Sequence, residues 1–447
     1  MIGEDVLYLP VSELSARIRT HQLSPVELTR AYLDRIRKLS PRLNAFETVA
    51  EDVALMQARN VESELNRGHW LGPLHGIPYG AKDLLATSGI RTTWGARPLK
   101  EQVFDHDATV VRKLRDAGAV LLGKCAMVEL AGGLGYRFAD ASVSGPGRNP
   151  WNPSRWTGGS SSGSGAAVAA GLAGFALGTE TWGSILCPAA FCGITGLRPT
   201  YGRVSRAGAM VCSWTFDKIG PLARSAADCR LVLQAIAGAD PANPSAASEP
   251  VKHGTVKRDW SNMRAASAVS ELRAMGLDLV EAKLPDFPAS ELAGLIISAE
   301  AISAFEKLFE DGRVLHLRDV YAAHQPEINA AVSGADLVKA WRMRAALQER
   351  MADFFGDWDV IVTPNFLSVA SRIEDDLYQA LPYSDPVGAI GNACGLPAIA
   401  LPCGYGKEHM PASFQIVAAP WDEGLLLDLG EAFQRSTVFH LGRPPVE

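Results

Sequence analysis

Hydrophobic positions near the start of the chain recur with the period of a helix. The apolar side chains that share one face at this spacing are Leu28, Tyr32, Ile36 and Leu39. Ser24 stands just before them, followed by Pro25 and by Glu27 three residues after the serine. A capping serine, a proline at the first helical position and this glutamate are together typical of a helix N-terminus. The pattern therefore predicts a helix that begins after Ser24.

Further along the chain, helical patterns are followed by short apolar runs. Residues 108–118 predict a helix that ends at glycine, and 119–123 a short strand. Residues 165–172 predict another helix, before a buried strand at 175–179. The remaining predictions are a helix at 265–275 and strands at 277–282, 359–363, 398–401 and 414–417. Helices that precede short apolar strands indicate an α/β fold.

Two segments interrupt these patterns. Serine, glycine, proline and asparagine crowd residues 141–165, which favours irregular backbone there. Residues 240–250, DPANPSAASEP, are the best candidate for a linker. We therefore expect a catalytic portion at 1–240 and a smaller C-terminal portion at 251–447.

Composition excludes several classes of function. Hydrophobic residues make up 47% of the chain and charged residues 21%, as in soluble globular proteins. The net charge is −6 and there is no basic run, so we expect no nucleic-acid partner. The first residues lack an apolar signal segment, and the small-apolar stretch 166–178 is too short to span a bilayer. We expect a cytoplasmic protein without a membrane anchor.

Cysteine and histidine give no sign of a metal or disulfide framework. The seven cysteines form no CxxC pair, and the nine histidines show no HExxH spacing. We therefore expect reduced thiols, no bound metal and no cofactor.

A run of glycine and serine, GGSSSGSG at 158–165, carries the first sign of chemistry. It fits a flexible linker, a phosphate cradle or a rigid loop with unusual backbone angles. An alanine-rich helix follows at once, which argues against a linker. The lysine of the GxxxxGK[ST] phosphate loop is absent, so a nucleotide-binding module is a weak alternative.

Five sequence blocks resemble the amidase signature family, in matching order and from about residue 14 to 433. They are GPLHGIPYGAKDL at 72–84, RNPWNPSRWTGGSSSGSGAAVAAG at 148–171, GTETWGSILCPAA at 178–190, GITGLRP at 193–199 and NACGLPAIALP at 392–402. The resemblance implies a single domain over 1–447, with α/β/α layers around a large, mixed and twisted β-sheet. It also implies a Ser-Ser-Lys catalytic triad of Lys82, Ser160 and Ser184, and a cis peptide bond between Gly159 and Ser160.

The residue types of this triad suit amide hydrolysis. A serine hydroxyl becomes a good nucleophile only when a base removes its proton, and a lysine can act as base only when neutral. Burial can lower the lysine pKa from its free value of about 10.4. We therefore expect Lys82 to be buried, Ser160 to relay the proton and Ser184 to attack the carbonyl. Asp83 and Ser161 are expected to hold this geometry in place without taking part in the proton transfers.

Backbone N–H groups close to the nucleophile are the candidates for an oxyanion hole. The turn formed by Thr181, Trp182 and Gly183 is expected to provide them, together with Ser184. Members of the family commonly have glycine at position 182. An indole there either narrows the pocket or forms an aromatic wall, or else it points away and packs.

A second departure concerns substrate charge. The family often has arginine two or three residues after the nucleophile, where this chain has Leu186 and Cys187. Such an arginine can bind a substrate carboxylate, so its absence weakens the prediction of a carboxylated substrate. Residues 130–138 and part of the C-terminal portion are expected to line the pocket.

The leading prediction is an amidohydrolase that cleaves a small carboxamide into an acid and ammonia or an amine. Two alternatives share its chemistry: the glutaminase subunit of a tRNA-dependent amidotransferase, and an esterase. A homodimer is the default expectation for such an enzyme, and an accessory subunit stays open. Ammonia release from simple amides or from glutamine, by the chain alone, distinguishes these functions.

Overall fold

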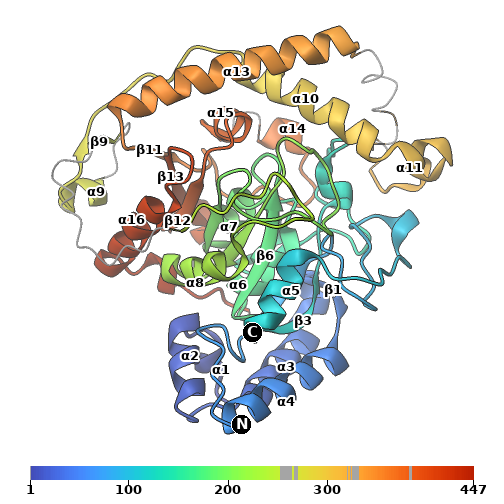
Figure 1. Ribbon diagram of the computed structural model, residues 1–447, viewed down its shortest axis with the longest axis vertical. Helices are drawn as coiled ribbons and strands as arrows, with labels where there is room; N and C mark the ends of the chain where they lie inside the picture. Colours follow the sequence, from blue (N-terminus) through green and yellow to red (C-terminus); the bar gives the residue numbers. More distant parts are fainter. Residues whose placement is uncertain are drawn as a thin grey trace.

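A large mixed β-sheet forms the centre of the computed structural model, which describes residues 2–251, 264–265, 270–319, 321–322, 324, 332–381 and 385–446 (Figure 1). Its strand order is β1-β3-β2-β6-β8-β7-β12-β13-β11-β9-β10. The strands are β1 (Phe46–Val49), β2 (Pro78–Lys82), β3 (Val120–Cys125), β6 (Phe175–Glu180), β7 (Thr195–Arg198), β8 (Lys218–Ala223), β9 (Arg264–Ala265), β10 (Asp278–Leu279), β11 (Val360–Pro364), β12 (Ala398–Tyr405) and β13 (Pro411–Ala418). A separate hairpin pairs β4 (Arg148–Asn149) with β5 (Asn152–Trp156).

The sheet is shared by the segments on both sides of the predicted linker. Strand β2 runs parallel to β3 and β6, and β6 is antiparallel to β8. Strand β7 then pairs with β12, so that Arg198 lies opposite Ala398. Within the linker candidate, Asp240 is buried and accepts hydrogen bonds from Thr109 and Ser205. This residue is therefore packed against the main body.

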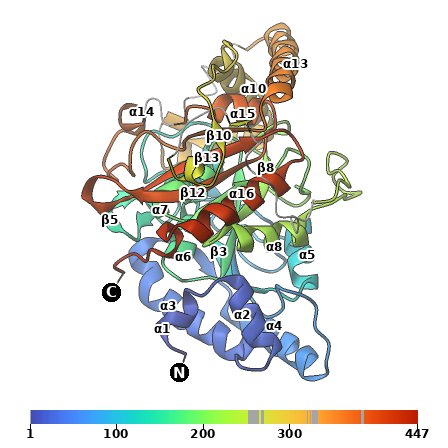
Figure 2. The ribbon, with the colours of Figure 1, turned by 90° about the vertical axis from the view of Figure 1, so that its left-hand side faces the viewer.

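Helices cover both faces of this sheet (Figure 2). They are α1 (Glu4–Leu7), α2 (Val11–Arg19), α3 (Pro25–Leu43), α4 (Glu51–Asn66), α5 (Thr109–Asp116), α6 (Ser162–Ala169), α7 (Leu186–Cys192), α8 (Ala226–Ile236), α9 (Ser270–Ala274), α10 (Ala289–Ala304), α11 (Glu306–Glu310), α13 (Gly334–Asp357), α14 (Leu377–Ala380), α15 (Gly388–Ala393) and α16 (Glu423–Ser436). Gly430 of α16 lies against Ile399 of β12, whereas Gly196 of β7 lies against Ala189 of α7. Gly196 pairs with Ala400, and neighbouring side chains of a strand point to opposite faces. Helices α7 and α16 therefore cover opposite faces.

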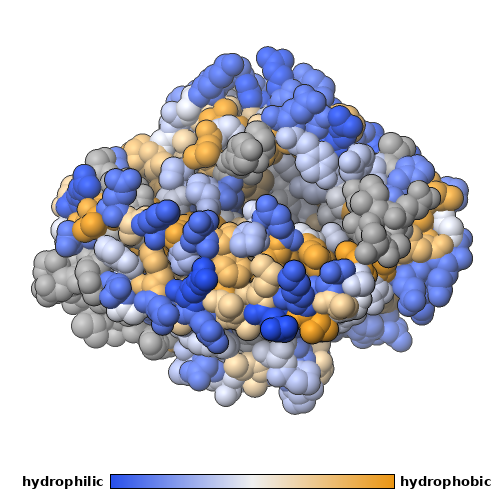
Figure 3. All heavy atoms as spheres, turned by 90° about the horizontal axis from the view of Figure 1, so that it is seen from above, coloured by the Kyte–Doolittle hydropathy of each residue, from blue (hydrophilic) through white to orange (hydrophobic). Residues whose placement is uncertain are grey.

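The remaining helices extend the molecule at both ends. Helices α1 to α4 lie at one end of the molecule, and α10 and α13 arch over the other (Figure 1). The face above α10 and α13 mixes hydrophilic and hydrophobic side chains (Figure 3). Helix α13 carries two exposed large apolar residues, Val338 and Trp341. Within the described ranges, no helix is both long and apolar enough to cross a membrane.

The structure confirms the predicted α/β class and its layers. Helix α3 begins as expected, with the Glu27 backbone N–H donating to Ser24 Oγ at 3.1 Å. The cysteines are free thiols, of which six are buried and Cys403 is partly exposed.

Several predicted boundaries were wrong. Helix α6 begins at Ser162 rather than 165, and its first turn is held by tertiary contacts: the Gly163 N–H donates to the Ala126 carbonyl oxygen at 2.8 Å, and a Cβ at Gly163 would lie 2.2 Å from the Ala45 carbonyl oxygen. The segment 141–165 also contains β4 and β5. The strand predicted at 277–282 is reduced to Asp278–Leu279. Part of the helix predicted at 265–275 lies outside the described residues, and α9 occupies 270–274.

Candidate active site

Strand ends bring the predicted triad to one edge of the sheet. Lys82 is the last residue of β2, and Ser184 lies in the turn after the neighbouring parallel strand β6. Ser160 lies between β5 and α6. Carboxyl ends of parallel strands meet at the same edge of a sheet, where α/β proteins place their sites. All three residues are buried, with exposed fractions of 0%, 1% and 7% for Lys82, Ser160 and Ser184.

The Lys82 amine is held by three oxygen atoms. Its Nζ donates to Ser160 Oγ at 2.8 Å, to Thr179 Oγ1 at 2.9 Å and to the Thr179 carbonyl oxygen at 3.4 Å. Burial lowers the Lys82 pKa to about 7, although the nearby Asp217 carboxylate acts in the opposite direction. A substantial fraction of Lys82 is therefore neutral near pH 7, as a general base requires.

Ser161 ties the loop that carries Ser160 to β6. Its Oγ donates to the Thr179 carbonyl oxygen at 3.2 Å and accepts from the Thr179 N–H at 3.3 Å. Its backbone N–H donates to the Ser184 carbonyl oxygen at 3.4 Å. The expected cis peptide bond between Gly159 and Ser160 is present. Ser161 thus joins the backbone of both candidate serines.

Carboxylates anchor the turn at 181–184 on both sides. Thr181 Oγ1 donates to Asp217 Oδ1 at 2.6 Å. Glu180 Oε2 accepts from the backbone N–H groups of Ile185 and Leu186, and its Oε1 pairs with Arg198 at 2.8 Å. Burial alone would raise the Glu180 pKa, but Arg198, Lys218 and the hydrogen bonds outweigh it and lower the pKa. The ionised Glu180 therefore fixes the backbone just after Ser184.

The N–H groups of this turn are available to a ligand. Within the described parts of the chain, the backbone N–H groups of Thr181, Trp182, Gly183 and Ser184 donate to no acceptor. Gly183 has a φ of +81°, a conformation that favours glycine, and a Cβ there would meet open space. Unpaired backbone donors beside a nucleophile can bind a developing oxyanion.

A cavity of about 370 Å³ opens next to both serine-bearing segments. Gly159 and Gly183, the neighbours of Ser160 and Ser184, form part of its wall. Its other lining residues are Gly132, Gly135, Tyr136, Trp156, Trp182, Cys187, Phe366, Leu377, Tyr378, Leu381 and Asp385. The expected contribution of residues 130–138 is confirmed. Trp182 faces the cavity and is 38% exposed, which decides between the two orientations left open by the sequence.

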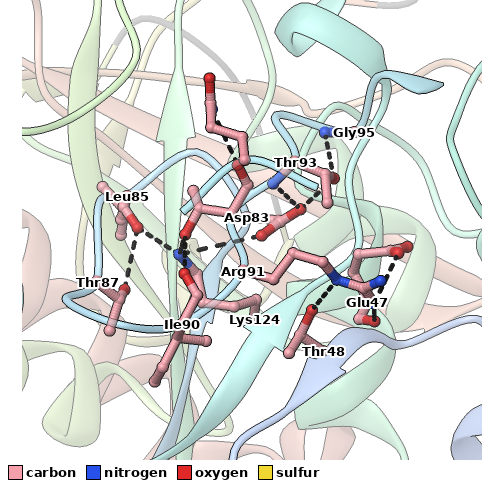
Figure 4. Close-up of polar contacts among 12 residues, drawn as sticks. Glu47, Thr48, Asp83, Leu85, Thr87, Ile90, Arg91, Thr93, Gly95 and Lys124 are labelled. Carbon is pink, nitrogen blue, oxygen red and sulfur yellow. Dashed lines mark hydrogen bonds and ion pairs between the residues drawn. The ribbon is translucent and has the colours of Figure 1, made fainter. Parts of the chain in front are cut away.

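Behind Lys82 lies a buried ion pair between Asp83 and Lys124 (Figure 4). Lys124 Nζ lies 4.0 Å from Asp83 Oδ1 and also donates to the Leu85 carbonyl oxygen and to Thr92 Oγ1. Asp83 Oδ2 accepts from the backbone N–H of Thr93 at 2.9 Å and from its hydroxyl at 2.5 Å. Burial raises the Asp83 pKa and lowers the Lys124 pKa. The pair fastens the loop that follows β2 and so braces the strand end at Lys82.

Sequence reasoning missed several residues around the triad. Thr179 and Glu180 lie in the same sequence block as Ser184, so the sequence could have predicted that they lie close to it. Lys124, Asp217 and Asp385 stand in no block that carried the resemblance, and only the fold places them here. Within the described ranges, no cluster of histidine, cysteine or carboxylate side chains could hold a metal ion.

Comparison with known proteins points to one family. Residues 27–427 match the family model described as Amidase. One subunit of the glutamyl-tRNA(Gln) amidotransferase of Moorella thermoacetica is 35% identical, over 98% of this chain and 99% of that protein.

Two solved structures share the fold over almost their whole length. The peptide amidase of Stenotrophomonas maltophilia has 30% identity and a TM-score of 0.84, with 98% of each chain covered. The corresponding glutamyl-tRNA(Gln) amidotransferase subunit from Thermotoga maritima has 27% identity, a TM-score of 0.84 and 100% coverage of both chains. The chain therefore belongs to the amidase signature family and is an enzyme that hydrolyses C–N bonds.

Proposed function

We propose that this protein hydrolyses a carboxamide through a covalent acyl-enzyme formed on Ser184. The observation that carries the proposal is the contact between the buried Lys82 amine and Ser160 Oγ at 2.8 Å. A lysine whose pKa is lowered to about 7 has the neutral form needed to receive a proton. Ser160 connects this base to the nucleophile, which lies in the neighbouring turn. The proposal uses no cofactor.

In the first half of the reaction, Ser184 Oγ attacks the amide carbonyl carbon. Its proton passes to Ser160 Oγ, and the Ser160 proton passes to neutral Lys82. The carbonyl electron pair moves onto the oxygen, which binds the N–H groups of the 182–184 turn. When the intermediate collapses, the C–N bond breaks and the leaving nitrogen takes a proton from Ser160, which regains one from Lys82. Ammonia or an amine leaves, and the acyl group stays on Ser184.

In the second half, water takes the place of the nucleophile. The same relay removes a proton from water, which attacks the ester carbonyl of the acyl-enzyme. The C–O bond to Ser184 breaks, and the serine oxygen recovers its proton through Ser160. The products are the free acid and the regenerated enzyme. A single oxyanion-hole donor typically contributes about 10²–10³ in rate, so the free N–H groups are central to the proposal.

A serine-directed fluorophosphonate tests the proposed nucleophile and base. Ser184→Ala is expected to abolish covalent labelling, and Lys82→Met to slow it strongly without unfolding the protein. Ser413→Ala is a matched control, because Ser413 is 8% exposed and its hydroxyl has no hydrogen-bond partner among the described residues. Labelling of Ser184→Ala at the wild-type rate would show that another residue is the nucleophile.

A second candidate is the hydrolysis of glutamine as part of an amidotransferase. The names of the curated relatives, with 35% identity over 98% of this chain, support it more strongly than they support a free-standing amidase. The cavity supports the free-standing amidase, because its described lining contains no cationic side chain for the glutamine carboxylate. Ammonia release from glutamine but from no simple amide would favour the second candidate and the need for an accessory subunit.

Esterase activity, a cytoplasmic location and a homodimer are further proposals. Ester cleavage would use the same acyl-enzyme and would be lost in Ser184→Ala. Sedimentation equilibrium of the purified chain, alone and at several concentrations, would measure the oligomeric state directly.

A further inference from the structure

The cavity beside Ser184 has a wall of rings and hydrocarbon. Its large side chains are Tyr136, Trp156, Trp182, Phe366, Leu377 and Leu381. Its volume of about 370 Å³ is near the lower end of the range for small-molecule sites, about 300–1,000 Å³. The size and lining therefore suit a compact apolar group.

Charge in this cavity is confined to one carboxyl group. Among the described lining residues, Asp385 is ionisable in the acidic range, and no lysine, arginine or histidine is present. Burial raises the Asp385 pKa to about 6, although Arg198 and Gln415 act in the opposite direction. Gln415 Nε2 donates to Asp385 Oδ1 at 2.6 Å. A carboxylated substrate would meet an acid instead of a counter-charge, and an unpaired buried charge is costly.

Trp182 lies at the junction between this carboxyl group and the nucleophile turn. A methyl group on Gly388 would lie 2.5 Å from Asp385 Oδ2 and 2.9 Å from Trp182 Nε1. The polar edge of the indole and the carboxyl group thus both lie over Gly388, where any larger residue would displace them. The rest of the indole is available to the cavity, two residues before Ser184.

We infer that this pocket selects an uncharged acyl group about the size of an aromatic ring, and that Trp182 is its specificity-determining residue. The inference rests on the proposed function, because it assigns the cavity to the acyl group that Ser184 receives. An aromatic acyl group would lie against the Trp182 indole, and ring pairs in such sites stabilise binding beyond the burial of area. Cys187 also lines the cavity, at one of the two positions where other members often have arginine, and it brings no positive charge.

Two sulfonyl fluorides with the same leaving group test this selectivity. Phenylmethanesulfonyl fluoride places a benzyl group in the acyl position, whereas methanesulfonyl fluoride places only a methyl group there. Fluoride is too small to occupy the cavity, so the ratio of the two labelling rates at Ser184 reports on the acyl pocket. We expect Trp182→Ala to lower this ratio at least tenfold relative to wild type, and Trp182→Phe to retain most of it.

Trp341→Ala provides the matched control, because Trp341 is 43% exposed on α13 and does not line the cavity. It is expected to leave the ratio unchanged. Protection against labelling adds a second readout: phenylacetamide should protect Ser184 at lower concentrations than glutamine does.

The outcomes separate the inference from the proposed function. A ratio that is the same in Trp182→Ala and wild type would overturn the inference, as would stronger protection by glutamine or no protection by either amide. In each of these cases Ser184 still reacts, and the proposed nucleophile stands. If neither reagent modified Ser184, the proposed function itself would fail, and the inference with it.

Discussion

Replacement of Lys82 by methionine should stabilise the protein while removing its activity. Methionine is close to lysine in length and can occupy the same buried space. It loses the amine that contacts Ser160 and Thr179, so acylation of Ser184 should slow strongly. It also removes an ionisable group whose protonated form is disfavoured by burial. The sign and size of the stability change follow from the pKa of Lys82.

The magnitude comes from the difference between two protonation equilibria. Burial lowers the Lys82 pKa from 10.5 to about 7, and a difference of about 3.5 between these pKa values corresponds to about 5 kcal/mol. Loss of the amine leaves the Ser160 and Thr179 hydroxyls without a donor, at about 1 kcal/mol each. We therefore expect Lys82→Met to raise the free energy of unfolding by about 3 kcal/mol at pH 7.

This gain should depend on pH in a defined direction. Between pH 7 and 10.5 the unfolded chain keeps the Lys82 proton that the folded protein has released, so wild-type stability rises with pH. The slope from this group is about 1.4 kcal/mol per pH unit. The Lys82→Met variant lacks this pH dependence, so its gain in the free energy of unfolding over wild type is fully present below pH 7 and declines as the pH rises above 7.

Urea unfolding of both proteins at several pH values between 6 and 9.5 measures this difference. Other titrating groups are common to the two proteins and cancel in the comparison. Lys100→Met is a suitable control, because it makes the same substitution at an exposed position. A stability difference between Lys82→Met and wild type that stays constant from pH 7 to 9.5 would refute the reasoning, since Lys82 would then carry its proton in the folded state.

Three further predictions follow from the site. The acylation rate of wild type should rise with pH through about 7 and then level off, because neutral Lys82 is the proposed base; a rate independent of pH between 5.5 and 8.5 would contradict this assignment. Lys124→Met should lower the free energy of unfolding, measured with urea, by about 3–5 kcal/mol, since it leaves the buried Asp83 without its ion-pair partner; a loss below about 1 kcal/mol would contradict the role of this ion pair in stabilising the loop after β2. Gly183→Ala meets no clash but must adopt a positive φ, at about 1–2 kcal/mol; we expect slower labelling of Ser184 with the fold retained, and an unchanged labelling rate would argue against the turn as an oxyanion site.

The sequence was sufficient for the candidate residues that stand in local blocks. Lys82 and Ser160 were named from such blocks, and the structure brings their side chains to 2.8 Å. The sequence also distinguished helices from strands where the apolar residues followed a clear pattern, as in α3 and β6. The predicted boundaries of helices and strands were wrong where tertiary packing outweighed the local amino-acid composition. The glycine-serine run begins a helix in which Gly163 lies against the Ala45 carbonyl and donates its N–H to the Ala126 carbonyl oxygen, contacts that no local pattern records.

The rest of the site depends on segments far apart in the chain. The orientation of Trp182 is set beside Gly388 and Asp385, about 200 residues later. Asp217 accepts a hydrogen bond from Thr181 in the turn that carries Ser184, and no sequence pattern around Asp217 predicts this contact. Side chains of this kind are placed by the sheet and its covering helices, so they become visible only once the fold is known.

The pairing of β7 with β12 has a consequence for how the protein is made. Arg198 emerges from the ribosome about 200 residues before its partner Ala398. At a synthesis rate of roughly 5–20 residues per second, β7 is therefore made about 10–40 s before the strand that pairs with it. During this time its backbone donors and acceptors form an open edge, the kind of surface that recruits other strands. The nascent chain therefore carries an open strand edge throughout this stage, and a chain stopped near residue 240 would keep this aggregation-prone edge permanently.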